Sequence, residues 1–225
     1  GPLLMTGNIL FKGGAGQSVT VNGEVASSGP RRNIVVRGNA AALGSVTFAS
    51  AVADAGNFFI DSSGVNTAVN VTVGSVDANA ITVRGGTVNL GGIYSAATGS
   101  IDIIGAANLT GNTILATSGG TRFSRFQGTV DGAFSLTMNA GTGKATFLQA
   151  VGGVTPLTNL TVTAAGVHNI VQNISVTNNF SWTLLEAVAN GDNLTLSLGR
   201  SISAGNSILI EVADTFINRN GGLNN

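Results

Sequence analysis

The sequence predicts an all-β fold in which the chain coils as a parallel β-helix, or solenoid, and three observations lead to this prediction. Short runs of alternating apolar and polar residues recur along the 225 residues, each bounded by Gly, Asn or Ser. Through the first six runs, the second apolar residue recurs every 10–15 residues. Hairpin signals are few, since Asn-Gly or Asp-Gly pairs occur at four places only, and this disfavours a β-sandwich.

Ten of these runs are expected to be strands, because alternation of period two places one apolar face toward a core. In chain order they are residues 18–23, 33–38, 45–50, 57–62, 70–75, 80–85, 100–103, 135–139, 159–163 and 193–197. Val, Ile, Leu and Phe are expected to stack inside, and Thr, Ser and Asn to face outward. The 33 Gly and the many Asn are expected at tight corners. With roughly 20–24 residues in each turn and about 4.8 Å between strands, the chain would form about ten rungs and a rod of roughly 48 Å.

Two segments depart from the pattern. Residues 182–191 contain helix-forming residues and end in Asn-Gly, so they are expected either as one or two helical turns or as a longer strand with a buried Trp182. Residues 1–5 resemble the remnant of a cleaved expression tag and are left outside the fold. Residues 6–225 are then expected to be a single β-helix segment, cut at both ends from a longer protein.

The composition excludes several classes of protein. The chain has 10 basic and 10 acidic residues, so the fraction of charged residues is far below the quarter or so that is usual in globular proteins. No cluster of basic residues is large enough to neutralise a run of phosphates. A nucleic-acid partner is therefore not expected. The absence of Cys excludes disulfides, zinc–cysteine sites and a Cys nucleophile. The sequence contains no apolar run of about 18 residues, so it predicts no membrane-spanning helix.

Two stretches resemble a known family. Residues 130–147, continuing through 150–157 to 160–164, and residues 193–206 with 216–222 are similar to the repeats of very large secreted bacterial proteins of the filamentous haemagglutinin and autotransporter-adhesin type. The resemblance implies a right-handed parallel β-helix that is exported and associated with the cell surface. It also implies an outer-membrane secretion partner for the full-length protein.

The main enzymatic alternative is a polysaccharide lyase or hydrolase, since both occur on β-helices. A hydrolase of this kind needs paired carboxylates, and a lyase needs clustered acidic residues for calcium with a basic partner. The acidic residues are scattered, since only Glu211 and Asp214 lie within four positions of each other, and Asp54 with Asp61 is the pair that could meet on adjacent faces. We therefore expect no catalysis, no catalytic residues, no metal and no cofactor.

Other motifs have simple structural interpretations. Gly13–Val19 resembles a calcium-binding nonapeptide but has Ser18 where a carboxylate is needed, so a Gly-rich corner is expected. His168, the only His, is expected at a surface corner. Six Asn-x-Ser/Thr triplets begin at Asn70, Asn108, Asn159, Asn173, Asn179 and Asn193. They are expected to be corners followed by strands, with glycosylation as the alternative.

One patch is a candidate ligand contact: Arg122, Phe123, Arg125 and Phe126 interleave cations with rings that could hold a sugar or a carboxylate. The alternative is that these arginines cover a loop and keep the rod soluble.

The expected function is a structural and adhesive rod segment of a secreted or cell-surface bacterial adhesin. Its expected partner is a receptor or glycan on a host or neighbouring cell, and the chain itself is expected to be a monomer or to associate end to end. The alternatives are the carbohydrate-active enzyme, a carbohydrate-binding module, and a phage or self-assembling fibre module.

Overall fold

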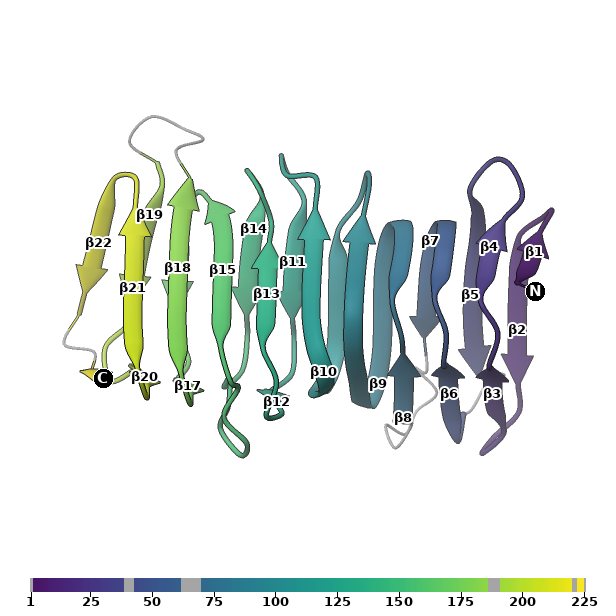
Figure 1. The fold of residues 1–225 in the computed structure, drawn as a ribbon, viewed down its shortest axis with the longest axis horizontal. Coiled ribbons are helices and arrows are strands. Elements are labelled where there is room, and N and C mark those ends of the chain that lie inside the picture. Colours follow the sequence, from purple (N-terminus) through teal and green to yellow (C-terminus); the bar gives the residue numbers. More distant parts are fainter. Residues whose placement is uncertain (1, 39–42, 62–69, 186–190, 220–221, 225) are drawn as a thin grey trace.

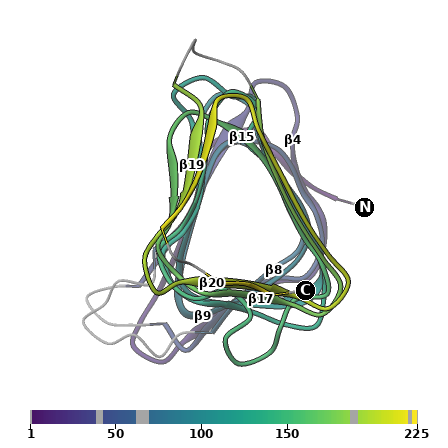
Figure 2. The ribbon, with the colours of Figure 1, turned by 90° about the vertical axis from the view of Figure 1, so that its left-hand side faces the viewer.

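In the computed structural model the chain is a parallel β-solenoid of about nine turns with a triangular cross-section (Figures 1 and 2). The structure describes residues 2–38, 43–61, 70–185, 191–219 and 222–224. Within these residues the secondary structure is β throughout, and no helix is long and apolar enough to cross a membrane. The all-β solenoid predicted from the alternating runs is confirmed.

Each turn contributes strands to three parallel sheets, which we call faces 1, 2 and 3. Face 1, at the front of Figure 1, contains β1 (Leu3–Met5), β4 (Val25–Ser27), the start of β7 (Val52–Asp61), both ends of β9 (Val76–Ala96), the end of β10 (Ile101–Thr117), β13 (Leu136–Asn139), β15 (Leu160–Ala165), β18 (Asn179–Leu185) and β21 (Ser207–Val212).

Face 2, at the back of Figure 1, contains β2 (Ile9–Gly13), β5 (Arg32–Gly38), the end of β7, part of β9, the start of β10, β11 (Phe123–Phe126), β14 (Lys144–Phe147), β16 (His168–Ile170), β19 (Asn193–Leu196) and β22 (Thr215–Asn218). Face 3, at the bottom, contains β3 (Ser18–Val21), β6 (Ser45–Phe48), β8 (Asn70–Val73), parts of β9 and β10, β12 (Val130–Asp131), β17 (Ile174–Val176), β20 (Ser201–Ala204) and β23 (Gly222–Asn224).

The coil is right-handed. In Figure 2 the C-terminal end faces the viewer, and the chain passes from face 2 at the left through face 3 at the bottom to face 1 at the right as it approaches. This counter-clockwise advance toward the viewer is the right-handed sense that parallel β-crossovers favour.

The turns vary more in length than the sequence predicted. Residues paired across neighbouring turns are as few as 17 positions apart, as for Thr72 and Asn89, and as many as 28, as for Ile174 and Ile202. The extra residues lie in loops at the corners, whose length the alternating pattern does not specify. For this reason the chain makes about nine turns instead of ten.

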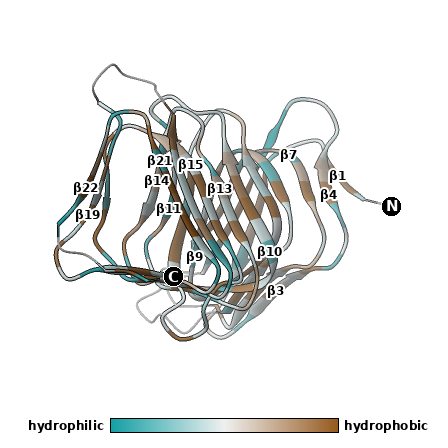
Figure 3. Cartoon of the chain, turned by 60° about the vertical axis from the view of Figure 1, so that its left-hand side comes forward, coloured by the Kyte–Doolittle hydropathy of each residue, from teal (hydrophilic) through white to brown (hydrophobic). Residues whose placement is uncertain are grey.

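Inward-facing residues stack in register to form the core. One column on face 2 joins Val36, Ile60, Val83, Ile103 and Phe126 through successive pairings, and all five are 0% exposed. Figure 3 shows the alternation of apolar and polar residues along the strands. Burial of this aliphatic and aromatic column stabilises the solenoid, because each such side chain contributes about 1.5–3 kcal/mol.

The two segments that depart from the alternating pattern both form strands. Trp182–Leu185 belongs to β18, with Trp182 buried, so the strand alternative is the one observed and the helical one is wrong there. Residues 186–190 lie outside the described residues. The expectation that residues 1–5 lie outside the fold is wrong for Leu3–Met5, which pairs with β4 as β1 and places Met5 in the core.

The segment Gly13–Val19 forms the predicted Gly-rich corner. The Gly14 N–H donates to Oε1 of Gln17 at 2.7 Å, and Gly16 has a φ of +70°. A Cβ at Gly13 would lie 2.4 Å from a methyl of Leu43, so the Leu43 side chain would have to shift to admit one.

Candidate functional site

Face 2 is interrupted between two successive turns. In the described part of the chain β14 pairs with β11 only, and β16 pairs with β19 only, so no ladder joins β14 to β16. The other faces continue through the same turns, because β15 pairs with β18 on face 1 and Val151 pairs with Ile174 on face 3. The interruption is therefore local to one side of the triangle.

His168 accounts for the interruption. Its ring is buried, with Nδ1 3.0 Å from the Ala145 carbonyl oxygen on β14 and Nε2 2.9 Å from the Ala165 carbonyl oxygen. In a regular parallel ladder a backbone N–H of the next turn would lie against the Ala145 carbonyl, and here the imidazole of His168 takes that position. The predicted surface position of His168 is wrong. It faces inward at the start of β16, where each ring nitrogen lies within hydrogen-bond distance of a backbone carbonyl and, in the neutral ring, one of the two donates.

Burial lowers the pKa of His168, because an imidazolium loses hydration inside the solenoid. The carbonyls of Ala165 and Ala145 oppose this effect, the charge of Lys144 adds to it, and the charge of Asp192 opposes it. The Asp192 side chain is fully buried and accepts a hydrogen bond from the Gly166 N–H. His168 is therefore held neutral at pH values where an exposed His takes up a proton.

A cavity of about 290 Å³ opens at the interruption. Its inner wall includes Phe147, Trp182, Ile170 and Ile174, which are 3–7% exposed, while Val167 at 52% lies toward solvent. The Trp182 ring lies 6.3 Å from the Phe147 ring, edge to face.

The indole of Trp182 also lies 5.8 Å from the His168 ring in the same kind of arrangement. Trp182 belongs to face 1, so its side chain spans the core to reach this opening on face 2. Three aromatic rings from three strands therefore meet at one cavity.

The indole Nε1 of Trp182 has no hydrogen-bond partner, although it is buried. Two other buried side-chain atoms among the described residues share this property, Oγ1 of Thr117 and Oγ of Ser124. Of the three residues, only Trp182 lines this cavity. Sequence reasoning missed the site, although the only Trp and the only His of the chain belong to it.

The four residues of the predicted patch do not share one surface: Phe126 lies inside the solenoid, and Arg122, Phe123 and Arg125 lie outside. Phe126 is 0% exposed and stacks on Phe147 inside, with ring centroids 5.7 Å apart, so its expected place at a surface contact is wrong. Alternation explains this outcome, since β11 points Ser124 and Phe126 inward and Phe123 and Arg125 outward.

The three other members of the patch lie outside and make local contacts. Arg122 donates from Nε to the Thr98 carbonyl at 2.7 Å. The Arg125 guanidinium lies 4.7 Å from the Phe123 ring and donates to Asp102 at 2.5 and 3.0 Å. The hydrogen bonds to Asp102 raise the pKa of Arg125. These contacts tie consecutive turns together.

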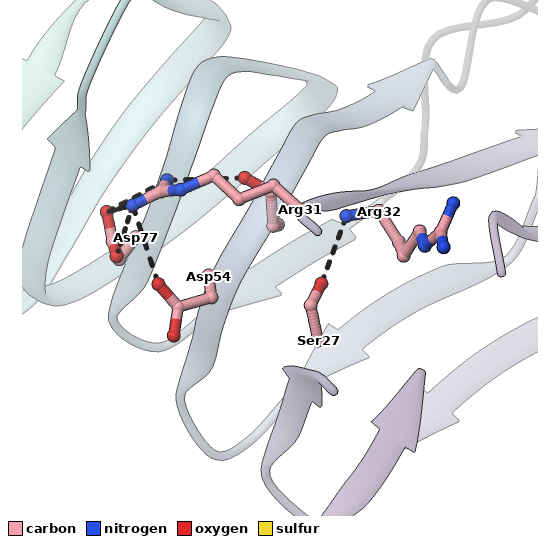
Figure 4. A network of polar contacts seen from close by, with 6 residues as sticks. Ser27, Arg31, Arg32, Asp54 and Asp77 are labelled. Atoms are coloured by element: carbon pink, nitrogen blue, oxygen red, sulfur yellow. Dashed lines mark hydrogen bonds and ion pairs between the residues drawn. The ribbon is translucent and has the colours of Figure 1, made fainter. Parts of the chain in front are cut away.

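Asp54 and Asp61, the carboxylate pair considered for a hydrolase, engage different arginines. Arg31 reaches Asp54 at 3.5 Å and Asp77 at 3.0 Å, and it also donates to the Ala55 carbonyl (Figure 4). Asp61 lies 3.5 Å from Arg84. Arg31, Asp54 and Asp77 come from successive turns, so this network is a clamp along the rod. No group of three His, Asp or Glu among the described residues could hold a metal ion.

Several predicted corner asparagines bond to the neighbouring turn. Oδ1 of Asn159 accepts from the Asn179 N–H at 3.2 Å, while its Nδ2 donates to Ser135 at 2.9 Å. Oδ1 of Asn173 accepts from the Ser201 N–H at 3.1 Å. These amides replace backbone ladder bonds at the corners, in agreement with the structural interpretation of the triplets.

The fold and these contacts define a right-handed parallel β-solenoid whose turns are clamped by arginine–carboxylate and asparagine contacts, with one interrupted face. No protein-family model, no curated protein sequence and no solved structure matches the chain.

Proposed function

We propose that the chain is a structural and adhesive rod segment of a secreted or cell-surface bacterial adhesin, acting without catalysis. The observation that carries this proposal is the regular stacking of parallel turns around one continuous core, which makes the chain a long rod. Such an architecture suits a spacer, because each turn contacts only its neighbours and the length of the rod grows with the number of turns.

The long sides of the rod support the same function. Part of the charge described on them is neutralised within the solenoid by clamps such as Arg31 with Asp77 and Arg125 with Asp102. Outward positions are mostly Thr, Ser and Asn, which bond from turn to turn. A neutral, regular surface suits a stiff spacer that holds contact loops away from a cell.

One loop is a candidate adhesive contact. The loop that leads into β15 projects at the bottom of Figure 1, and it carries Val154, which is 87% exposed. Oδ1 of Asp131 accepts hydrogen bonds from the N–H groups of Val154 and Thr155 at 2.8 and 3.1 Å. Val154 thus presents an apolar side chain at a held position on a projecting loop, which makes it the residue to substitute in a test of adhesion.

Two measurements test this function. Gold-labelled antibodies against the chain should decorate the surface of intact cells of the source organism, and beads coated with the chain should adhere to host or neighbouring cells. Val154→Asp should reduce bead adhesion without changing circular dichroism, whereas Val167→Asp, at an exposed position elsewhere, should not. Labelling confined to the cell interior would refute the proposed location. Adhesion equal to that of uncoated beads would refute the adhesive role.

A further inference from the structure

We propose that a cavity at the start of β11 and β14 binds an acidic sugar, with Arg122 and Lys144 holding its carboxylate. The inference deepens the adhesive function proposed above, on which its biological role rests, because it names the class of glycan that the rod contacts. Three observations carry it: two cations without carboxylate partners, an aromatic ring beside them, and a cavity that fits one sugar ring.

The cavity has a volume of about 230 Å³ and lies where two successive turns enter face 2. Its lining residues come from the corner before β11, the corner before β14 and the end of β15. β11 and β14 are neighbours on face 2 (Figure 1), and Phe123 pairs in register with Lys144. Their side chains both point outward, so the ring and the ammonium stem lie next to each other, at about the 4.8 Å separation of the strands.

Arg122 and Lys144 give this cavity two positive charges. Neither of them forms an ion pair with an acidic side chain anywhere in the described chain. The Arg122 guanidinium is held in place by Nε, which donates to the Thr98 carbonyl at 2.7 Å, and by Nη1, which donates to the Gly119 carbonyl at 2.8 Å. Its Nη2 donates to no group among the described residues, so it is oriented and available for a ligand. A carboxylate is the acceptor that such a guanidinium binds most strongly.

The nearest acidic residues do not occupy the cavity. Asp102 accepts hydrogen bonds from Arg125 and Gln127, and it is not among the lining residues. Asp192 is fully buried, where it accepts a hydrogen bond from the Gly166 N–H, and it does not line the cavity either. An anionic ligand therefore meets cationic side chains in this cavity and no carboxylate.

The rest of the lining indicates that the anion belongs to a sugar. Phe123 is partly exposed, and the Arg125 guanidinium over its ring at 4.7 Å holds it in place. An apolar ring of this kind packs against the C–H groups of a sugar, which a bare anion does not offer. Thr121 and Thr142 are exposed at the cavity, and Thr142 Oγ1 accepts from the Gly120 N–H at 2.8 Å, so its own O–H can donate to a sugar hydroxyl.

The size agrees with one sugar ring. A cavity of about 150 Å³ holds benzene, so about 230 Å³ accommodates one six-membered sugar ring with its carboxylate. A few polar groups placed around an apolar surface are the usual composition of a small-molecule site. A hexuronic acid meets all of these requirements.

Matched ligands test the chemistry directly. Methyl β-D-glucuronide and methyl β-D-glucoside share one ring and differ in having a carboxylate or a CH₂OH group. Added to the ¹⁵N-labelled chain, the glucuronide should shift the amide peaks of Gly120, Phe123 and Gly166 saturably, with a Kd of roughly millimolar order. The glucoside should bind about tenfold more weakly or less, and added salt should weaken only the glucuronide. Acetate, a carboxylate without a ring, should also bind about tenfold more weakly.

The two lysines of the chain provide a matched pair of variants. Lys144→Gln should weaken glucuronide binding by about three- to tenfold. Lys12→Gln makes the same change at an exposed position on β2, several turns away on the same face, and should bind as the wild type does. Phe123→Leu should weaken glucuronide binding and leave acetate binding unchanged. Both lysines are exposed, so circular dichroism of these two variants should match that of the wild type.

The outcomes that would overturn the proposal are specific. Equal affinities for glucuronide and glucoside would remove the two cations from recognition, and equal affinities for glucuronide and acetate would leave a simple anion site. Unchanged glucuronide binding in the Lys144→Gln chain would place the site elsewhere. The bead assay separates this proposal from the adhesive function. Saturable glucuronide binding by a chain whose beads do not adhere would support the site and refute the adhesive role, and adhesion without glucuronide binding would refute the site alone.

Discussion

Replacing Gly105 with Ala tests whether the close stacking of turns requires glycine at one corner. Gly105 lies between the parts of β10 on faces 2 and 3, with a φ of +118°. A Cβ there would lie 1.8 Å from the carbonyl oxygen of Gly85 in the preceding turn, and a Cβ on Gly128 would lie 2.1 Å from the carbonyl oxygen of Gly105. Three successive turns thus meet at this corner with only backbone between them.

Two costs determine the expected effect of Gly105→Ala. A non-glycine residue held at such a φ costs about 1–3 kcal/mol. Relieving the contact moves the backbone by more than an ångström and weakens about two ladder hydrogen bonds, each contributing about 1 kcal/mol. We therefore expect Gly105→Ala to lower the free energy of unfolding by roughly 3–5 kcal/mol.

The assay is urea unfolding followed by circular dichroism at the β-sheet band, with Gly7→Ala as the matched control. A Cβ at Gly7 meets nothing within 4 Å, and its φ is not in the positive range. The control should change stability by less than about 1 kcal/mol, and in the stabilising direction, since Ala reduces the freedom of the unfolded chain. A loss below about 1 kcal/mol for Gly105→Ala would show that the corner can rearrange and would refute the reasoning.

Three further predictions concern the core, a clamp and the buried His. Phe126→Ala should lower the free energy of unfolding by about 3–5 kcal/mol in the same urea assay, because the ring is fully buried and leaves a cavity; a surface-like loss under 1 kcal/mol would contradict its inward position. Asp102→Asn should cost about 1 kcal/mol or less, since Arg125 is partly solvent-exposed, and double-mutant analysis with Arg125→Gln should give a coupling that weakens with salt. For His168 the folded pKa is lowered, so the unfolded chain binds more protons near its ordinary pKa of 6.5, and stability should fall as pH falls through that value. His168→Gln should reduce the difference in stability between pH 7.5 and pH 5, and an unchanged difference would exclude His168 as its source.

The alternating runs were sufficient to predict most strands of the rod. The runs at 33–38, 45–50 and 70–75 became β5, β6 and β8, because period-two alternation has only one way to bury its apolar side. Long continuous strands such as β9 and β10 were expected only in part. They bend around corners without losing β geometry, and Gly92 and Gly105 supply the required positive φ.

The candidate cavity could not be predicted from the sequence. His168 follows Gly166 and Val167, a context typical of an exposed corner, and nothing local reports that the Ala145 carbonyl lies one turn away, 3.0 Å from its ring. The meeting of Phe147, His168 and Trp182 joins three strands separated by up to 35 positions. It depends on the lengths of the intervening turns, which no local pattern specifies.

The sequence by itself determined the class of fold, because alternation, Gly-rich corners and scarce charge each limit what a chain of this length can bury. It also determined which residues point inward in the strands that it predicted, as Val46 and Phe48 in β6 illustrate. Only the tertiary structure decided how many residues each turn contains, which carboxylate each arginine engages, and where face 2 is interrupted. The physical reason is that these features depend on contacts between turns 17–28 residues apart, whose register is set by the packing of the whole core.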